Sequence, residues 1–600
     1  MVGRQPVRYS VTKALFQSGE ISPYFLGRQD ANEYISGCKT MRNALPDSRG
    51  GFRKRPGTRV FEATDVNFRM LNYKYGEMNL VLFFYYNNEI RCRNTDGTEA
   101  NGSLTVTGIT QLVDDDTRFA VHKGIIYLVN PNKPVWNVSL SLSGTTITIT
   151  AAAMSFVGPA EGSDASSVMQ FNQAGDYPSA ICFKGGRLYL GASLNQPNTT
   201  WASRTPSGGS DRFNDFTFYD GTIDDPTISP SHAIEVAETD NEDSALLWYM
   251  VQKKVIAGYE HSILIETDNW ATPEDFDLDI AINEGSANIP AKAYKNYTVF
   301  ASPDGRRISL LVWDDDLDSY TTINIAKNAP HMLTSGIRAF DITISPDPVI
   351  WIVTNDGGLC ACSIDLSSGF IAWTAHPRTA GKYKDILSIG AEEHDKVAFR
   401  IDYTDEEAPK KYTLEIMDLN DNNSFCDCFS RKIYVSPTNS IEVSPQLEDQ
   451  TGLVAWTDKG ILAVSDEGSY SGLTYYRSVP TSVSTVYCVG LPVETEVELL
   501  PPALPSNGSS MFKLKRVSRI GFKYYESYGG TVRVEGREQE ILLEKYGKYK
   551  YGSNVNMVTD DVSIDIISNN TKDGSITVLH NEPVPFNILA ISATFEILEA

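Results

Sequence analysis

The chain has 600 residues, of which 52 are Lys or Arg and 76 are Asp or Glu, so its formal net charge is −24. A general nucleic-acid-binding surface is therefore not expected, because affinity for phosphate comes mainly from clustered cations. Hydrophobic residues make up 41% of the chain and aromatic residues 10%, which excludes a disordered protein and favours β structure.

No segment is predicted to span a membrane. The longest apolar run, from Leu80 to Tyr86, has seven residues, against the ~20 that a membrane-spanning helix needs. The N-terminus lacks the apolar core of a secretory signal, so the expected site of synthesis and retention is a cytosol.

Eight cysteines include two C-x-C pairs, Cys360 with Cys362 and Cys426 with Cys428. Because the seven His are scattered, we expect buried free thiols rather than metal ligands.

One short helix is predicted, near the N-terminus. It covers residues 28–42, where apolar side chains recur at spacings of three and four: Ala31, Tyr34, Ile35, Cys38 and Met41. Gly37 inside this range weakens the helical pattern.

Almost everything after Phe61 has the pattern of short strands separated by turns. Eight segments share an aromatic or aliphatic strand, a Gly, Asp or Lys turn and a second strand: 79–93, 119–129, 180–192, 246–260, 297–313, 349–364, 397–416 and 452–465. The turns recur every ~50 to 60 residues, about the size of a four-stranded propeller blade. The predicted fold is mainly β, an irregular β-propeller of about seven blades, with stacked β-sandwiches as the alternative.

Three regions follow from these patterns. Residues 1–62 form an N-terminal platform and docking segment with the helix and a basic hairpin. Residues 63–484 form the β-propeller. Residues 485–600, which begin with a Pro-rich strand and loop, form a C-terminal β platform domain that the N-terminal segment completes.

The sequence gives no support for catalysis. It contains no P-loop, GxGxxG, HExxH or GxSxG motif, and we predict no enzyme, no cofactor and no metal site. Three acidic clusters are interpreted as solvated loops rather than catalytic pairs: Asp114 to Asp116, Asp224 with Asp225, and Asp314 to Asp318. Asp275, Asp277 and Asp279 alternate along one predicted strand, but they lack the loop glycine and distal Glu of an EF-hand calcium site.

A basic cluster stands out in this acidic chain. Five cations lie within eleven residues: Arg49, Arg53, Lys54, Arg55 and Arg59. Such a cluster is expected to face negative charge, and we interpret it as a hairpin that docks on an acidic neighbouring subunit. An arm that contacts DNA and a plain solvated turn are the alternatives.

The segment 14–62 resembles the N-terminal signature of the tail nozzle proteins of short-tailed bacteriophages, also called tail tubular protein B. The residues that carry this resemblance include Gly19, Ser22, Pro23, Arg28, Asp30, Tyr34, Asn43, Arg55, Pro56 and Gly57. Residues 175–218 and 297–375 resemble the same family. Residues 485–600 resemble its closing domain more loosely.

The resemblance implies a structural protein of the virion tail, assembled in the cytoplasm of the bacterial host. Six copies would form a tube below the portal and adaptor rings, and double-stranded DNA would leave the capsid through its lumen without sequence-specific binding. The implied partners are the adaptor protein, a tail fibre or tailspike, and a tail-tip plug protein. An acidic lumen would let DNA slide, whereas a cationic one would hold it.

A tube of this kind needs a constriction that retains DNA before infection. Glycine- and serine-rich segments are the candidate gates, namely 158–167 and 203–215. The second holds two cations and a flexible centre: Arg204, Ser207, Gly208, Gly209, Ser210 and Arg212. A mobile surface loop is the alternative interpretation.

Two other functions stay open at this stage. A receptor- or carbohydrate-binding propeller would stack sugars on exposed aromatic side chains such as Trp136 or Trp201. A glycan hydrolase would use one of the acidic clusters.

Overall fold

The computed structural model describes residues 7–76, 78–94, 101–143, 146–157, 171–222, 225–238, 244–267, 271–390, 395–405, 410–422, 424–429, 440–448, 450–465, 468–471, 474–478, 483–504, 511–541 and 557–597. The chain divides into two compact units. Unit 1 comprises Met1–Asp65 and Lys327–Ala600, and unit 2 comprises Val66–Ala326. These units divide the chain differently from the predicted boundaries at residues 62 and 484.

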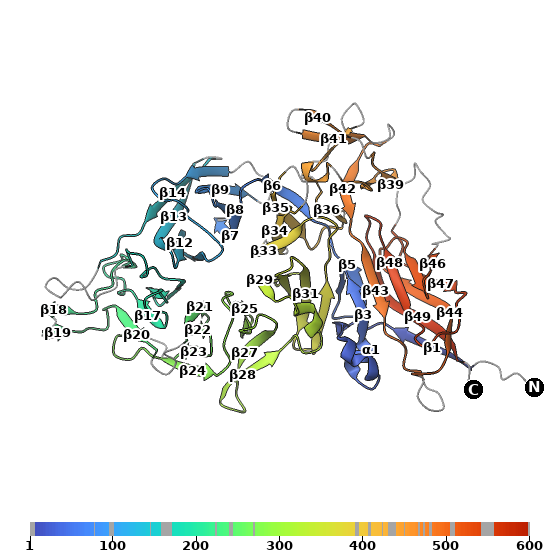
Figure 1. The fold of residues 1–600 in the computed structure, drawn as a ribbon, viewed down its shortest axis with the longest axis horizontal. Helices are drawn as coiled ribbons and strands as arrows, with labels where there is room; N and C mark the ends of the chain where they lie inside the picture. Colours follow the sequence, from blue (N-terminus) through green and yellow to red (C-terminus); the bar gives the residue numbers. More distant parts are fainter. Residues whose placement is uncertain are drawn as a thin grey trace, which may run out of the picture. The chain divides into compact units, whose positions relative to one another are not determined.

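Unit 2 consists of small antiparallel sheets that follow one another along the chain (Figure 1). Its first sheet has eight strands: β7 (Phe68–Tyr75), β8 (Met78–Tyr85), β9 (Glu89–Asn94), β10 (Asn101–Thr105), β11 (Arg118–His122), β12 (Ile125–Asn130), β13 (Lys133–Ser143) and β14 (Thr146–Ala153). These strands form two four-stranded meanders, which a parallel pairing of β10 with β14 joins.

Three further four-stranded sheets complete unit 2. The first contains β15 (Ala180–Lys184), β16 (Arg187–Gly191), β17 (Thr199–Ala202) and β20 (Ile234–Ala237). The second contains β21 (Leu246–Val251), β22 (Val255–Tyr259), β23 (Ile263–Glu266) and β24 (Leu278–Ile282). The third contains β25 (Lys292–Tyr294), β26 (Tyr297–Ala301), β27 (Ile308–Asp314) and β28 (Ser319–Asn324). Between β17 and β20 of the first of these sheets, the chain forms a small separate hairpin of β18 (Asp220–Thr222) and β19 (Asp225–Thr227).

Unit 1 contains two more meanders of the same kind. The first is β29 (Ile337–Thr343), β30 (Val349–Thr354), β31 (Leu359–Asp365) and β32 (Phe370–Ala375). The second contains β33 (Lys382–Ile389), β34 (Lys396–Asp402) and β35 (Tyr412–Asp418). Its fourth strand is β6 (Arg59–Thr64), which belongs to the N-terminal segment and pairs with β35. Their buried residues share one hydrophobic core with Leu45 of the N-terminal segment.

The two chain ends build the rest of unit 1 together. A six-stranded sheet contains β1 (Val7–Lys13), β4 (Ala44–Pro46), β5 (Phe52–Lys54), β44 (Lys515–Tyr524), β47 (Asp561–Asp565) and β49 (Asn587–Ile597). A second group extends the meander β29–β32 into a ten-stranded sheet: β2 (Gly19–Glu20), β3 (Gly37–Arg42), β43 (Thr495–Leu499), β45 (Thr531–Val534), β46 (Arg537–Glu540) and β48 (Ile576–His580). Burial alternates along part of β49, where Ile591, Ala593 and Phe595 are buried and Ser592 and Thr594 are half-buried, as expected for a sheet with one face against the core.

The described strands between Cys426 and Pro492 form two small sheets of unit 1. One contains β36 (Cys426–Asp427), β38 (Val454–Thr457), β39 (Gly460–Ala463) and β42 (Val486–Pro492), and the other contains β37 (Ser440–Val443), β40 (Gly468–Ser471) and β41 (Thr474–Ser478). The run of four-stranded meanders ends at Asp418, before these sheets begin.

The fold is mainly β with many small four-stranded sheets, and all eight predicted hairpins are present as paired strands.

The predicted helix was wrong in extent, because α1 covers only Asn32–Ser36 and the following residues form β3. Gly37 ends the helix in an extended conformation, where an added Cβ would lie 2.5 Å from the Glu33 carbonyl oxygen. Short 3-10 helices cover Pro23–Gly27, Pro330–Leu333 and Pro445–Leu447. No helix in the described ranges is long and apolar enough to cross a membrane.

Candidate functional site in the N-terminal segment

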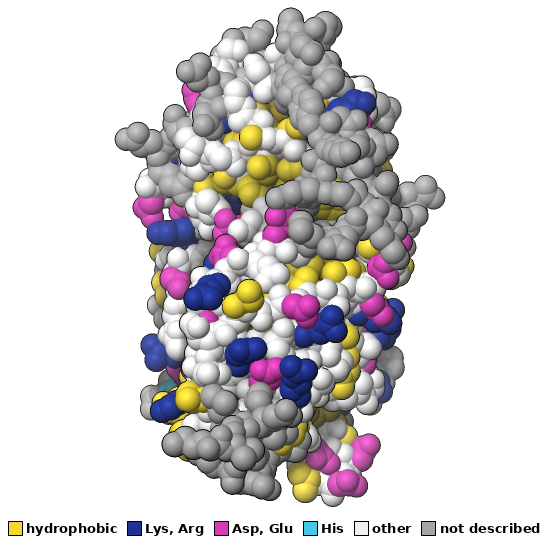
Figure 2. Space-filling view, turned by 90° about the vertical axis from the view of Figure 1, so that its right-hand side faces the viewer, with side chains coloured by type: hydrophobic (Ala, Val, Ile, Leu, Met, Phe, Trp, Pro, Cys, Tyr) yellow, Lys and Arg dark blue, Asp and Glu magenta, His cyan; other side chains and the backbone are white. Residues whose placement is uncertain are grey.

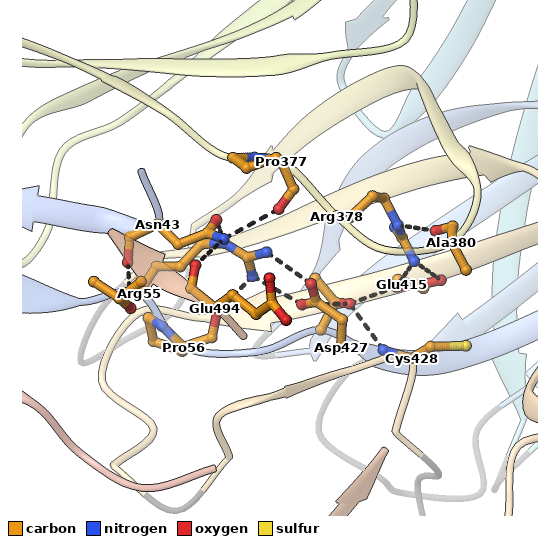
Figure 3. A network of polar contacts seen from close by, with 12 residues as sticks. Asn43, Arg55, Pro56, Pro377, Arg378, Ala380, Glu415, Asp427, Cys428 and Glu494 are labelled. Atoms are coloured by element: carbon orange, nitrogen blue, oxygen red, sulfur yellow. Dashed lines mark hydrogen bonds and ion pairs between the residues drawn. The ribbon is translucent and has the colours of Figure 1, made fainter. Parts of the chain in front are cut away.

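Arg55 lies at the place where the N-terminal segment passes from the six-stranded sheet to the meander β33–β35. Its side chain is fully buried. The guanidinium donates two hydrogen bonds to the carboxylate of Asp427, from Nη1 at 2.8 Å and from Nη2 at 2.7 Å, and a third from Nε to Oδ1 of Asn43 at 2.8 Å (Figure 3). Two parallel N–H···O bonds fix both position and orientation, so this pair locks the segment onto β36.

Asn43 supports Arg55 and joins two further segments. Its backbone has a positive φ of 50°, a conformation that Asn tolerates better than most residues. The side-chain amide donates to the carbonyl oxygens of Pro377 at 3.2 Å and Glu494 at 2.7 Å (Figure 3). Asn43 therefore connects the end of β32 with the start of β43.

A second buried ion pair lies beside the first. Arg378 donates from Nη2 to both carboxylate oxygens of Glu415 at 3.0 and 3.1 Å, and the Tyr403 hydroxyl donates to Oε1 of Glu415 at 2.8 Å. The hydroxyl of Thr58 lies between the carboxylates of Glu415 and Asp427. Thr58 thus links the two pairs into one network, in which two cations balance two anions.

The network holds Asp427 in its charged form. Burial alone would raise the pKa of this carboxyl, but the charge of Arg55 and its two hydrogen bonds outweigh that effect, and the pKa is lowered. The pKa of Arg378 is raised, because the nearby Glu415 outweighs the opposing effect of burial. Since these groups are enclosed by protein, the arrangement serves as a clamp between strands and offers no surface to a substrate.

Lys54, the last residue of β5, is also enclosed. Its Nζ donates to the Glu582 carbonyl oxygen at 2.6 Å and lies 3.1 Å from Nδ1 of His580. Burial lowers the pKa of Lys54 to about 7. Burial and the charge of Lys54 hold the pKa of His580 well below its usual value, so the imidazole stays neutral.

This gives a pH-dependent prediction for Lys54→Met. The folded-state pKa lies below the unfolded value, so between pH 7 and 10 the unfolded chain binds the extra proton and wild-type stability rises with pH. Relative to Lys54→Met, the free energy of unfolding should rise from pH 7 to pH 9 by at most ~1.4 kcal/mol per pH unit. Denaturant titrations at pH 6, 7, 8 and 9 measure this difference. Parallel pH profiles for the two proteins would show that Lys54 is not buried as described.

The predicted exposed docking hairpin was therefore wrong for Lys54 and Arg55, both of which are buried. Arg53 and Arg59 are half-buried in strands β5 and β6, and Arg53 donates to the Leu419 carbonyl oxygen at 3.2 Å. Arg49 alone among the five is exposed, and it pairs with Asp47 at 2.6 Å. The negative charge that this cluster faces lies within the chain, chiefly at Asp427.

Several residues before Asn43 that carry the sequence resemblance make contacts within the fold. Ser22 caps the 3-10 helix in which Pro23 is the first residue, and Tyr34 donates to the Pro501 carbonyl oxygen at 2.6 Å. Arg28 and Asp30 form an exposed ion pair at 3.0 Å. Gly19 has a φ of +58° and lies so close to β32 that a Cβ would come within 2.3 Å of the Trp373 carbonyl oxygen.

The candidate gate segment 203–215 lies in unit 2 and forms a closed turn. Two backbone hydrogen bonds of 3.0 Å join Ser207 and Ser210 around Gly208 and Gly209, and all four residues are exposed. Arg204 lies 4.0 Å from Asp215 and 3.9 Å from Asp220, with only 15% of its side chain exposed. Arg212 is half-buried. The other candidate gate, residues 158–167, lies outside the described residues.

The acidic clusters are mostly turn structures. Asp114 accepts hydrogen bonds from Asn130, Lys133 and the Asp116 amide, and Asp314 caps the exposed turn between β27 and β28. Asp224 lies outside the described residues. Among the described side chains, no group of three or more His, Cys, Asp or Glu could hold a metal ion.

The described aromatic and thiol side chains are largely internal. Trp201 is fully buried and donates to Glu235 at 3.0 Å, and Trp136 is half-buried, so neither is an exposed sugar platform. The eight cysteines are buried free thiols, as expected, and Sγ of Cys488 lies 3.7 Å from Sγ of Cys426.

The terminal sheet of unit 1 carries paired surface charges. Arg8 and Arg516 both contact Glu596, at 2.9 and 3.3 Å, and Arg519 contacts Asp565 at 3.0 Å. Figure 2 shows basic and acidic side chains interspersed over one face of the molecule rather than separated by sign. Among the side chains that this view colours, no extended patch of one charge sign is visible.

No protein-family model and no curated protein matches this chain. Solved structures with some similarity include the WD40 repeats of RRP9 (8% identity, TM-score 0.38, 61% of this chain and 100% of that one). Others are Raptor from Chaetomium thermophilum (11%, TM-score 0.38, 64% of this chain and 29% of that one) and a protein from Lactobacillus plantarum (10%, TM-score 0.32, 60% of this chain and 100% of that one). At these TM-scores the similarities carry no argument about function.

Proposed function

We propose that this protein is a subunit of the tail nozzle of a short-tailed bacteriophage, a structural protein of the virion. Six copies form a tube that attaches to the adaptor below the portal and conducts double-stranded DNA into the host. A tail fibre or tailspike and a tail-tip plug protein complete the set of partners.

One observation supports this proposal above the others. The segment that resembles the nozzle family is the segment that ties unit 1 together, because residues 14–64 supply β2 and β3 to the ten-stranded sheet, β4 and β5 to the six-stranded sheet, and β6 to the meander β33–β35. The residues that carry the resemblance therefore lie in the segment that joins three sheets of unit 1. A wall that carries mechanical load needs such joints between sheets.

We also propose that the meanders are blades of a β-propeller. The described residues contain seven four-stranded antiparallel meanders, from β7–β10 to β33–β35 with β6. A lone blade leaves apolar faces exposed, and a ring of blades covers them. In this arrangement β6 would close the ring by adding an N-terminal strand to the last blade.

The charge of the chain suits a conduit. Six copies would carry a formal charge of −144, since each carries −24. Duplex DNA carries one negative charge per ~1.7 Å, so an acidic wall repels it and keeps it from adhering during passage. Arg49, the exposed member of the basic cluster, is the residue through which the N-terminal segment would contact the adaptor, and the Ser207–Ser210 turn is the candidate gate.

Assembly tests this function directly. We expect the full chain, alone or mixed with its adaptor, to form rings of six copies of the 66.3 kDa chain, seen by sedimentation and electron microscopy. Arg49→Glu should weaken attachment to the adaptor at least tenfold, whereas Arg519→Glu, which changes another exposed and paired Arg, should not. A chain that stays monomeric with the adaptor present would contradict the proposal.

A carbohydrate-binding propeller is the second candidate, and one observation favours it. Trp313 is 44% exposed and packs edge-to-face on Tyr320, with ring centroids 4.9 Å apart, beside the acidic turn of β27 and β28. An exposed aromatic pair can stack on a sugar ring. Incubation with host polysaccharide separates the candidates, because a lectin binds the sugar, a glycan hydrolase shortens it, and a conduit does neither.

A further inference from the structure

The six-stranded sheet of unit 1 has two open edges. Four of its strands lie side by side in the order β1, β49, β44 and β47 (Figure 1). Within the described part of the chain, β1 pairs with β49 alone and β47 pairs with β44 alone. One side chain reaches the end of β47, where Nε2 of Gln539 donates to the Asp565 carbonyl oxygen at 3.4 Å. The rest of each outer edge presents backbone N–H and C=O groups that can accept another strand.

β1 has little of the protection that edge strands usually carry. Its seven residues include no Pro and no Gly, and they pair with β49 without a register shift. Lys13, the last of them, donates to the Ile35 carbonyl oxygen at 3.1 Å. Two other edge strands of unit 1 are protected, because β4 ends in Pro46 and the four polar residues of β46 are all exposed. A regular and unprotected edge is a template for pairing with another chain.

The apolar side chains of β1 and β47 are incompletely covered. Tyr9 and Val11 of β1 and Val562 and Ile564 of β47 pack against the same hydrophobic core, but each of them stays half-buried. These four residues lie on the same side of the sheet, two at each open edge. If β1 of one copy lay beside β47 of another, the two apolar pairs would meet and lose much of their contact with water.

The directions of the strands allow this contact. Each neighbouring pair in the order β1, β49, β44 and β47 is antiparallel, so β1 and β47 run in opposite directions. A second copy in the same orientation would therefore add its β47 to β1 as an antiparallel neighbour. One row of paired residues crosses the sheet from edge to edge: Thr12, Ser592, Gly521 and Ser563. This row brings Thr12 of one copy level with Ser563 of the next.

The charges of the two edges are opposite in sign. β1 contains Arg8 and Lys13, whereas β47 contains Asp561 and Asp565. Arg8 already pairs with Glu596 at 2.9 Å, and the two aspartates pair with Lys523 and Arg519 of β44. Such exposed pairs contribute little on their own. In the register of the Thr12 row, Arg8 gains Asp565 of the next copy as a diagonal neighbour, and no like charges face each other across the new pair.

We propose that β1 of one copy pairs with β47 of the next copy, so that the six-stranded sheets of neighbouring copies join edge to edge. The inference rests on the proposed function, because it names the strands through which six copies form a ring. A contact between two different surfaces of one chain closes into a ring or continues as a filament, whereas pairing of β1 with itself stops at a dimer. In the closed ring neither edge stays open.

Cysteine cross-linking tests this pairing. The double variant Thr12→Cys with Ser563→Cys places two exposed thiols on the row, in a chain whose eight native cysteines are buried. Rings of the full-length protein, alone or with the adaptor, are oxidised with copper phenanthroline and run on a denaturing gel without reductant. We expect a ladder of linked chains up to six copies, which reductant removes. The single variants Thr12→Cys and Ser563→Cys are the matched controls and should run as single chains.

Two proline variants give a second measurement. Successive N–H groups along a strand point to opposite edges, so one of Ser10→Pro and Val11→Pro removes an N–H from the open edge and the other removes a bond to β49. The first should keep the melting temperature of the isolated chain within about 5 °C of wild type and lower the yield of rings about tenfold or more. The second should lower the melting temperature itself.

Different results would overturn the inference and the proposed function. Rings that give no ladder, either with Thr12→Cys and Ser563→Cys or with Ser10→Cys and Ser563→Cys in a register shifted by two, would overturn the inference and leave the function standing. Linked dimers of Thr12→Cys alone would assign β1 to a symmetric pair of copies and would also overturn it. A chain that stays monomeric with the adaptor present contradicts the function, and the inference fails with it.

Discussion

Replacing Arg55 with Met is expected to lower the free energy of unfolding of unit 1 by about 3–5 kcal/mol. The substitution leaves the buried carboxylate of Asp427 without its two strongest hydrogen bonds and removes the donor to Asn43. A buried charge without a partner carries a large desolvation penalty, and Arg378 already pairs with Glu415. Denaturant titration measures the loss, and hydrogen exchange of residues 412–429 should show where protection disappears.

A double variant tests whether the loss comes from the stranded charge. Arg55→Met with Asp427→Leu replaces the pair by apolar groups and should recover ~2 kcal/mol or more of the loss. Arg519→Met, which breaks an exposed ion pair with Asp565, should change stability by less than about 0.5 kcal/mol. Equal effects of Arg55→Met and Arg519→Met would contradict the buried network.

Local patterns in the sequence predicted the strands well. Each of the eight hairpins is set by a short alternation of strand residues around a turn, and residues 349–364, for example, form β30 and β31 around Gly357, whose φ is +90°. Such information lies within about fifteen residues of chain. The helix over residues 28–42 was wrong in extent because the pairing of β3 with β43, far away in sequence, overrides the local helical spacing. A register shift between Cys38 and Thr40 lies between Cys38 and Met41, which are three positions apart and both buried in β3.

The buried network could not be predicted from local patterns. Five cations in eleven residues look like a surface patch because their partners are remote, and Asp427 lies 372 positions from Arg55. Arg378 and Glu415 had no local signal at all. Asp427 sits between Cys426 and Cys428, which were expected to be buried, and an acidic residue between two buried positions is the one available hint of an internal ion pair.

Gly57→Ala is expected to destabilise unit 1 by about 3 kcal/mol or more, because the new methyl group has no space. A Cβ at this position would lie 1.8 Å from the Cys426 carbonyl oxygen and 2.7 Å from the Cys426 amide nitrogen, both of which are backbone atoms of β36. Backbone atoms within a sheet cannot turn aside as the end of a side chain can. The change would separate β36 from the N-terminal segment and strain the contact between Arg55 and Asp427 two residues away.

Gly27→Ala is the matched control, since the same methyl group there meets no atom within 4 Å and the backbone has no positive φ. Its stability should stay within about 0.5 kcal/mol of wild type, measured by denaturant titration beside Gly57→Ala. In the proposed nozzle, Gly57→Ala should also reduce the yield of rings while Gly27→Ala does not, because the joint between sheets fails before subunits meet. If Gly57→Ala is as stable as wild type, residues 55–58 do not pack against β36. The conclusion that the N-terminal segment joins the sheets of unit 1 would then be wrong.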